Sequence, residues 1–140
     1  MSAPSSYESS IIAILKKEKI PFVREKTFKD LKRGKYRFDF YIPDYKGRSF
    51  LIEVDSELHY SYIKFFHKTP QGFTQSRGRD RDKNRFALRH RIPLYRIPHD
   101  EIQNIKSISD ILSIKYLVID AYHNDYVANR RKANEKIDKR

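Results

Sequence analysis

The sequence predicts an α/β fold of the α+β kind, in which helices cover a mixed sheet. Three observations support this class: a capped amphipathic helix comes first, three strand-like segments follow it, and a second helix leads directly into a further strand. Because this order fits within 140 residues, a single layered domain is expected.

The first helix is expected to begin at a capping box formed by Ser5 and Glu8, and Pro21 should stop it. The strands that follow are expected over 22–28 and 36–42, because apolar residues alternate there with polar ones, and over 50–54, which is a short apolar run. A turn over 43–47 contains Pro, Asp and Gly and joins the last two strands. These three strands are therefore expected to form an antiparallel meander.

The second half continues with a helix and a strand. The segment 58–66 is aromatic and fits either a helix or irregular structure, and 69–78 reads as a polar loop. A helix over 80–89 and a strand over 92–97 follow, with one or two short helices over 100–112. The expected domain covers residues 1–118, and residues 119–140 form a basic C-terminal extension.

The charge of the chain points to a polyanionic partner. The formal net charge is +12 and the sequence pI is about 9.9, so nucleic acid is the first candidate and an anionic membrane surface the second. A solvated surface is the alternative to both. The cations gather in two blocks, and those expected to contact DNA are Arg77, Arg79, Arg81, Arg85, Arg89, Arg130, Arg131 and Lys132.

No apolar run has the length of a membrane span, and the first residues do not form a secretory signal. The chain also lacks cysteine, which suits a reducing compartment. A cytoplasmic protein without a membrane partner is therefore expected.

Three acids occur where a buried strand would not normally carry them. Asp39 lies between Phe38 and Phe40, and alternation predicts that it faces away from both rings. Glu53 and Asp55 are two residues apart in the next strand, so they should point the same way. If these strands pair, the three carboxylates meet at one end of the sheet, where they repel one another unless a cation or proton intervenes. Mg²⁺, with Mn²⁺ as a substitute, suits such hard oxygen ligands.

Three further residues are candidates for the same site. Glu8 has equal claims as a helix cap and as a site acid, because it shares a helix row with the apolar face. His59 follows the acids closely and could hold water or a phosphate oxygen. Lys83 is a suitable point charge for a scissile phosphate. Asp55 is an equally good candidate for a strand-end cap.

Four segments, RFDFYIP, LIEVDSELHY, RDRDKNRFAL and IPLYRIPHDEI, resemble the PD-(D/E)XK, restriction-endonuclease-like superfamily. The nearest subgroup contains small phage and bacterial nucleases related to very-short-patch-repair and homing endonucleases. The resemblance covers 7–118 and implies the same core: a helix, a three-stranded meander, a helix and a further strand.

The resemblance also implies roles for individual residues. Glu8 matches the acid of the first helix, and Asp39 and Glu53 match the two metal ligands. A subgroup pattern, E-x-D-G-x-x-H, corresponds to Glu53, Asp55 and His59, with Ser56 in place of Gly. Asp55 occupies the position where the family usually has a lysine. A later R-D-x-x-K-N pattern implies that Lys83 takes the role of that lysine. This pattern matches Arg79, Asp80, Lys83 and Asn84.

The function implied is that of a Mg²⁺-dependent DNA endonuclease that hydrolyses phosphodiester bonds, in phage biology, homing, or DNA repair and recombination. Two alternatives stay open: a non-catalytic DNA-binding relative, and an interaction module for RNA or protein. Cutting both strands requires two active sites, which a homodimer would supply. The sequence leaves the oligomeric state open.

Overall fold

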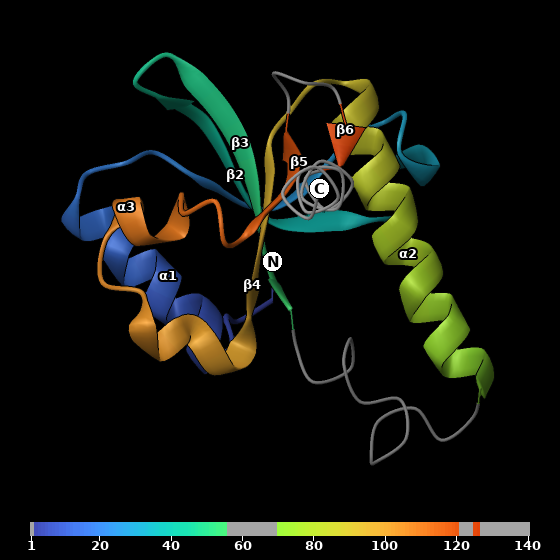
Figure 1. Cartoon of the computed structure of the whole chain (residues 1–140), viewed down its shortest axis with the longest axis horizontal. Helices are drawn as coiled ribbons and strands as arrows, with labels where there is room; N and C mark the ends of the chain where they lie inside the picture. The colour runs from blue at the N-terminus through green and yellow to red at the C-terminus, as the bar shows by residue number, and fades with distance from the viewer. Residues whose placement is uncertain (1, 56–69, 121–124, 127–140) are drawn as a thin grey trace, which may run out of the picture.

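The computed structural model describes residues 2–55, 70–120 and 125–126. A six-stranded mixed sheet in the order β1-β2-β3-β4-β5-β6 forms its centre, with α1 and α3 on one side and α2 on the other (Figure 1). The predicted α/β class is confirmed. The elements in chain order are α1 (Ser6–Lys17), β1 (Val23–Thr27), η1 (Lys32–Gly34), β2 (Arg37–Tyr45), β3 (Arg48–Asp55), α2 (Pro70–Arg89), β4 (Leu94–Pro98), η3 (His99–Asn104), α3 (Ile108–Ile111), β5 (Leu117–Asp120) and β6 (Asp125–Tyr126).

Helix α1 begins at the expected capping box. The Glu8 N–H donates to Ser5 Oγ at 3.1 Å, and the Ser5 N–H donates to Glu8 Oε1 at 3.1 Å. Two backbone donors that a helix start leaves without partners are thereby satisfied.

The expected meander is present, but its turn is tighter than predicted. Strand β2 pairs antiparallel with β1 and β3 and continues to Tyr45, so Pro43 and Asp44 belong to the strand. Lys46 and Gly47 form the turn, and both have positive φ angles, 53° and 81°. Two-residue hairpin turns with this geometry match the natural twist of the strands they join.

The polar loop predicted over 69–78 is wrong, because α2 begins at Pro70. Proline is tolerated in the first turn of a helix, where its missing N–H would have no intrahelical partner. The chain then enters β4, which pairs in parallel with β3, as a crossover helix requires.

The C-terminal part of the sheet was not expected. Strand β5 pairs antiparallel with β4, and β6 pairs with β5. The boundary expected at residue 118 therefore falls inside β5, and strand pairing continues beyond it. The segment 58–66 lies outside the described residues.

The sheet separates two apolar clusters. The cluster beneath α1, η3 and α3 contains the buried Phe40, Ile52 and Ile97, whereas the cluster beneath α2 contains Phe38 and Phe86. Because both faces are covered, the central strands β3 and β4 are almost continuously apolar, and any charge on them needs a partner. Within the described ranges, no helix is long and apolar enough to cross a membrane.

Candidate active site

The three acids predicted on β2 and β3 are placed at the face that α2 covers. Glu53 contacts Lys83 of α2, and Asp39 is hydrogen-bonded to Glu53. Asp55 contacts Arg96 of β4. The acids therefore lie at the interface between the sheet and one helix, and not on an open sheet edge.

Asp39 inserts its carboxyl group into the pairing between β2 and β3. The register of these strands begins at Phe40 and Ile52, and beyond that pair the Val54 N–H donates to Asp39 Oδ2 at 2.8 Å. A side chain thus takes the place of a backbone acceptor. The backbone ladder of the two strands is interrupted at this point, and the Asp39 carboxyl group supplies the acceptor for Val54.

The alternation argument for Asp39 is correct for Phe40 and wrong for Phe38. Phe40 belongs to the cluster under α1, but Phe38 belongs to the cluster under α2. Phe38 pairs with Lys26 of β1 and Phe40 pairs with Arg24, but Glu25 between these two β1 residues has a positive φ of 52°, so the ladder is irregular at Asp39. The ring of Phe38 therefore lies on the same side as Asp39.

The two neighbouring carboxyl groups differ in protonation. Burial, then repulsion by Glu53 and a hydrogen bond with Glu53, raises the pKa of Asp39 to about 9. Burial alone would also raise the pKa of Glu53, but Lys83 and Arg96 hold it below its usual value. At neutral pH, Asp39 therefore carries a proton and Glu53 carries a negative charge.

Lys83 reaches this pair from α2. Its Nζ lies 2.6 Å from Glu53 Oε1, and the exposed fractions of the two side chains are 15% and 6%. The same Nζ lies 5.5 Å from the centroid of the Phe38 ring. A partly buried ammonium group therefore faces a buried carboxylate beside an aromatic ring, where electrostatic interactions are stronger than in water.

Arg96 belongs to this site and was missed as a site residue. It lies on β4 directly beside Glu53 of β3. Its side chain is 9% exposed, and it donates to Asp55 Oδ1 at 3.0 Å and to Asn84 Oδ1 at 3.1 Å. The available signal was an arginine inside the otherwise apolar strand LYRIP, which has the same unexpected character as Glu53 inside FLIEV.

The expected three-acid metal site is not assembled. Within the described ranges, no group of three or more His, Cys, Asp or Glu side chains could hold a metal ion. Asp55 Oδ1 accepts a hydrogen bond from Arg96, while Asp39 and Glu53 face each other. The sequence could not show this division, because the partner of each acid comes from a different element.

Glu8 is accounted for by its cap. Its carboxylate accepts from the Ser5 N–H, and α1 packs on the face of the sheet opposite α2. The capping alternative is the one that these contacts support. His59, Arg130, Arg131 and Lys132 lie outside the described residues.

The other predicted DNA contacts lie on α2. Arg77, Arg79, Arg81, Arg85 and Arg89 all fall within this helix. Arg81, Arg85 and Arg89 are exposed and four residues apart, so they follow one stripe of the helix surface. The helix that brings Lys83 to the acids thus also carries a row of cations.

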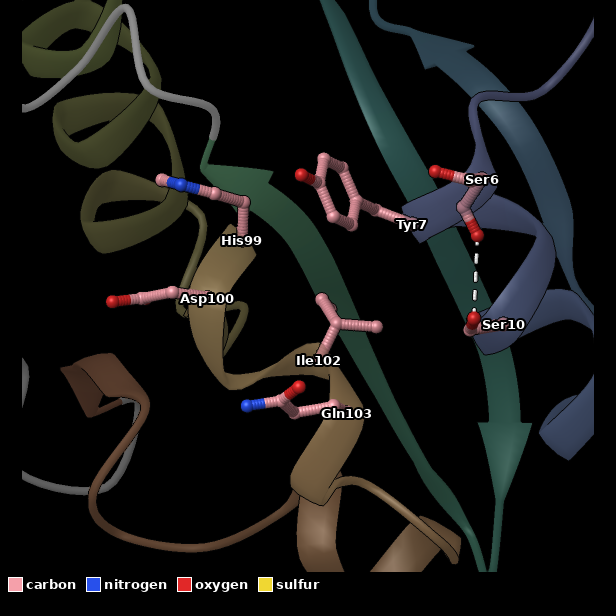
Figure 2. Close-up of a pocket in the computed structure, with 7 residues that line it drawn as sticks. All are labelled: Ser6, Tyr7, Ser10, His99, Asp100, Ile102 and Gln103. Atoms are coloured by element: carbon pink, nitrogen blue, oxygen red, sulfur yellow. Dashed lines mark hydrogen bonds between the residues drawn. The ribbon is translucent and has the colours of Figure 1, made fainter.

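Near these elements, two hollows are lined by residues in the described part of the chain. The first, of about 450 Å³, lies between the start of α1 and η3, and Figure 2 shows its lining: Ser6, Tyr7, Ser10, His99, Asp100, Ile102 and Gln103. This lining contains an aspartate and neither lysine nor arginine, so it does not suit a phosphate. The second, of about 340 Å³, is lined by Tyr36, Gly78, Arg79 and Asp82, and Arg79 is one helical turn from Lys83.

Comparisons with protein-family models, with curated proteins and with solved structures found no match. Function is therefore inferred from the geometry and electrostatics of this chain.

Proposed function

We propose that the protein is a metal-dependent DNA endonuclease of the PD-(D/E)XK type, which hydrolyses phosphodiester bonds at a cluster of Asp39, Glu53 and Lys83. One observation carries the proposal: β2, β3 and α2 bring together two carboxyl groups and an ammonium group in a largely buried site. A structural role would not require two carboxyl groups so close together that one of them must stay protonated.

The acid pair fits a divalent cation. Asp39 and Glu53 share a hydrogen bond, and burial and repulsion by Glu53 raise the pKa of Asp39 to about 9, so that a bound proton offsets the repulsion. A cation offers the same relief, and carboxylate oxygens are the ligands that Mg²⁺ prefers. Asp39 and Glu53 would hold it, with Mn²⁺ as a substitute. When bound, the metal would supply an activated water and stabilise negative charge on the phosphate.

The other residues of the cluster bind and orient the substrate. Lys83 holds a positive charge beside Glu53 at 2.6 Å, where an attacked phosphate would gain negative charge. The Phe38 ring and the burial of Glu53 exclude water, which strengthens that interaction. Asp39 must lose its proton before both acids can hold a cation.

DNA is the proposed substrate because the helix that carries Lys83 also carries exposed cations. Arg81, Arg85 and Arg89 form a stripe that can neutralise backbone phosphates, and the net charge of +12 favours the approach of a polyanion. Phosphate contacts of this kind position a strand without reading its sequence. Action on DNA would place the activity in the cytoplasm of a bacterial cell, and a homodimer would account for cleavage of both strands.

A non-catalytic DNA-binding protein is the second candidate. It is favoured by the ion pair itself, because Lys83 already neutralises Glu53 without a metal. In that case the basic stripe of α2 would bind DNA, and the cluster would only hold the helix on the sheet.

Cleavage assays with matched amide variants separate these candidates. Plasmid, linear duplex and four-way junction DNA would be incubated with Mg²⁺, Mn²⁺ or EDTA. Asp39→Asn and Glu53→Gln keep the shape of each side chain but remove its charge. Asp44→Asn, in the exposed part of β2 near the turn, is the control because its contact is with the Gly47 N–H.

The wild type and Asp44→Asn should cut DNA only with metal, and both site variants should bind DNA without cutting it. Binding by the wild type without cleavage under every condition would favour the second candidate. Cleavage by both site variants at the wild-type rate would mean that the active site lies elsewhere. Stronger competition by RNA than by DNA would instead favour an RNA-binding module.

A further inference from the structure

Arg96 connects the sheet to α2 through several contacts. Its Nη1 lies 3.0 Å from Asp55 Oδ1 on β3 and 3.6 Å from Asp80 Oδ1 on α2. Its Nε donates to Asn84 Oδ1 at 3.1 Å, and its Nη2 donates to the Asp80 carbonyl at 3.4 Å. The planar guanidinium therefore joins one strand to two positions of the helix at once.

The two helix positions flank the lysine of the proposed site. Asp80 and Asn84 are four residues apart, so they lie on the same side of α2, one turn from each other. Lys83 lies between them in the sequence and points to Glu53, which is the neighbour of Arg96 across β3 and β4. A rotation or a slide of α2 would therefore break the Arg96 contacts and the contact between Lys83 and Glu53 together.

Stability alone does not explain a charge at this position. Replacement of a buried ion pair by apolar residues of similar volume is often neutral or stabilising, and the cluster beneath α2 is otherwise apolar. The planar guanidinium of Arg96 differs from an apolar side chain because its hydrogen bonds are directional. Its N–H groups can donate to Asp80 and Asn84 together in only one placement of the helix.

We propose that Arg96 is a positioning residue that sets the rotation and height of α2 on the sheet, so that Lys83 stands at Glu53. The proposal rests on the proposed nuclease function and adds a residue that acts through Lys83. Arg96 itself does not need to touch DNA or metal in this role.

A double-mutant cycle in cleavage tests the proposal. Arg96→Met, Lys83→Ala and the double variant would be compared with the wild type in kcat at saturating DNA and in DNA affinity. Because a misplacement of about 1 Å can lower a rate about 100-fold, Arg96→Met should lower kcat by about 10- to 100-fold. DNA affinity should change by less than about twofold, since the exposed cations remain.

The double variant should be no slower than Lys83→Ala alone, because two residues that act as one unit are not additive. Arg48→Met removes the same charge at the far end of β3 and should cut DNA at the wild-type rate. Arg96→Lys keeps the charge but lacks the fork, so it should recover less than half of the lost rate. Full recovery by lysine would overturn the proposal, because charge alone would then be sufficient.

The proposal would also be overturned if kcat of the double variant fell by the product of the two single-variant losses. A folded Arg96→Met variant with wild-type kcat would overturn it as well. If Arg96→Met does not fold, Asn84→Ala takes its place in the cycle, since it removes one acceptor and leaves Asp55 and Asp80. Its loss of rate should disappear in the Lys83→Ala background. If Lys83→Ala itself cuts at the wild-type rate, the proposed function fails at this site, which is a different result from a failure of Arg96 alone.

Discussion

The raised pKa of Asp39 leads to a prediction about the free energy of unfolding. Replacement of Asp39 by asparagine should stabilise the protein at neutral and alkaline pH in metal-free buffer. The asparagine amide can accept from the Val54 N–H and donate to Glu53, so it reproduces the contacts of the protonated acid. Unlike aspartate, it needs no proton to do so.

The size of the effect follows from the two pKa values of Asp39. In the unfolded chain its pKa is 3.8, and in the folded protein burial and Glu53 raise it to about 9. Between these values the folded protein binds one more proton than the unfolded chain, so stability falls as pH rises, by up to about 1.4 kcal/mol per pH unit. From pH 5 to pH 8 the wild type should therefore lose up to about 4 kcal/mol relative to Asp39→Asn.

Glu53 does not cancel this trend. Its pKa is lowered by Lys83 and Arg96 against the effect of burial, so its contribution is present above its usual pKa and is lost only as pH falls below that value. The interval from pH 5 to pH 8 lies above that range and reports on Asp39.

Urea unfolding of both proteins at pH 5, 6, 7 and 8, with EDTA, measures the difference. The gap between the two free energies of unfolding should widen with pH, and Asp44→Asn should follow the wild type. Addition of Mg²⁺ at pH 8 should narrow the gap, because a ligand that binds only the folded wild type stabilises it. Parallel curves across the whole interval would show that Asp39 is not protonated in the folded protein.

Three further predictions concern α2 and the C-terminus. Lys83→Ala should lower kcat by about 100-fold or more but change DNA affinity little, and an equal loss of both would make it a simple backbone contact. Gly78→Ala should raise Tm, because an added Cβ meets nothing within 4 Å and a glycine inside a helix is about 0.5–1 kcal/mol less favourable than alanine; a lower Tm would refute this. Deletion of 127–140 removes a basic segment, so it should flatten the plot of log affinity against log salt while cleavage at saturating DNA persists.

Local patterns were sufficient for several elements of the fold. The start of α1 could be predicted because the cap is made by Ser5 and Glu8, three residues apart, without help from the rest of the chain. The first two strands of the meander could be predicted because alternation has a period of two residues, and the third because it is a short apolar run. The unusual acids could also be found, since Asp39 and Glu53 interrupt apolar strands and a charge there needs a reason.

Tertiary structure decided which charges meet. Glu53 and Lys83 are 30 residues apart, and no spacing rule connects a strand residue to a crossover helix. The same packing directs Asp55 to Arg96, so that two acids predicted to act together have different partners. It also places Phe38 on the side of α2, beside Phe86.

The sequence by itself determined the fold class, the basic character of the protein and the identity of two unusual acids, because these depend on composition and on neighbours along the chain. Only the tertiary structure decided that the pKa of one acid is raised, that the other is paired with a lysine, and that an arginine of β4 links β3 to α2. The physical reason is that protonation and ion pairing depend on burial and on distances between elements that are remote in the sequence.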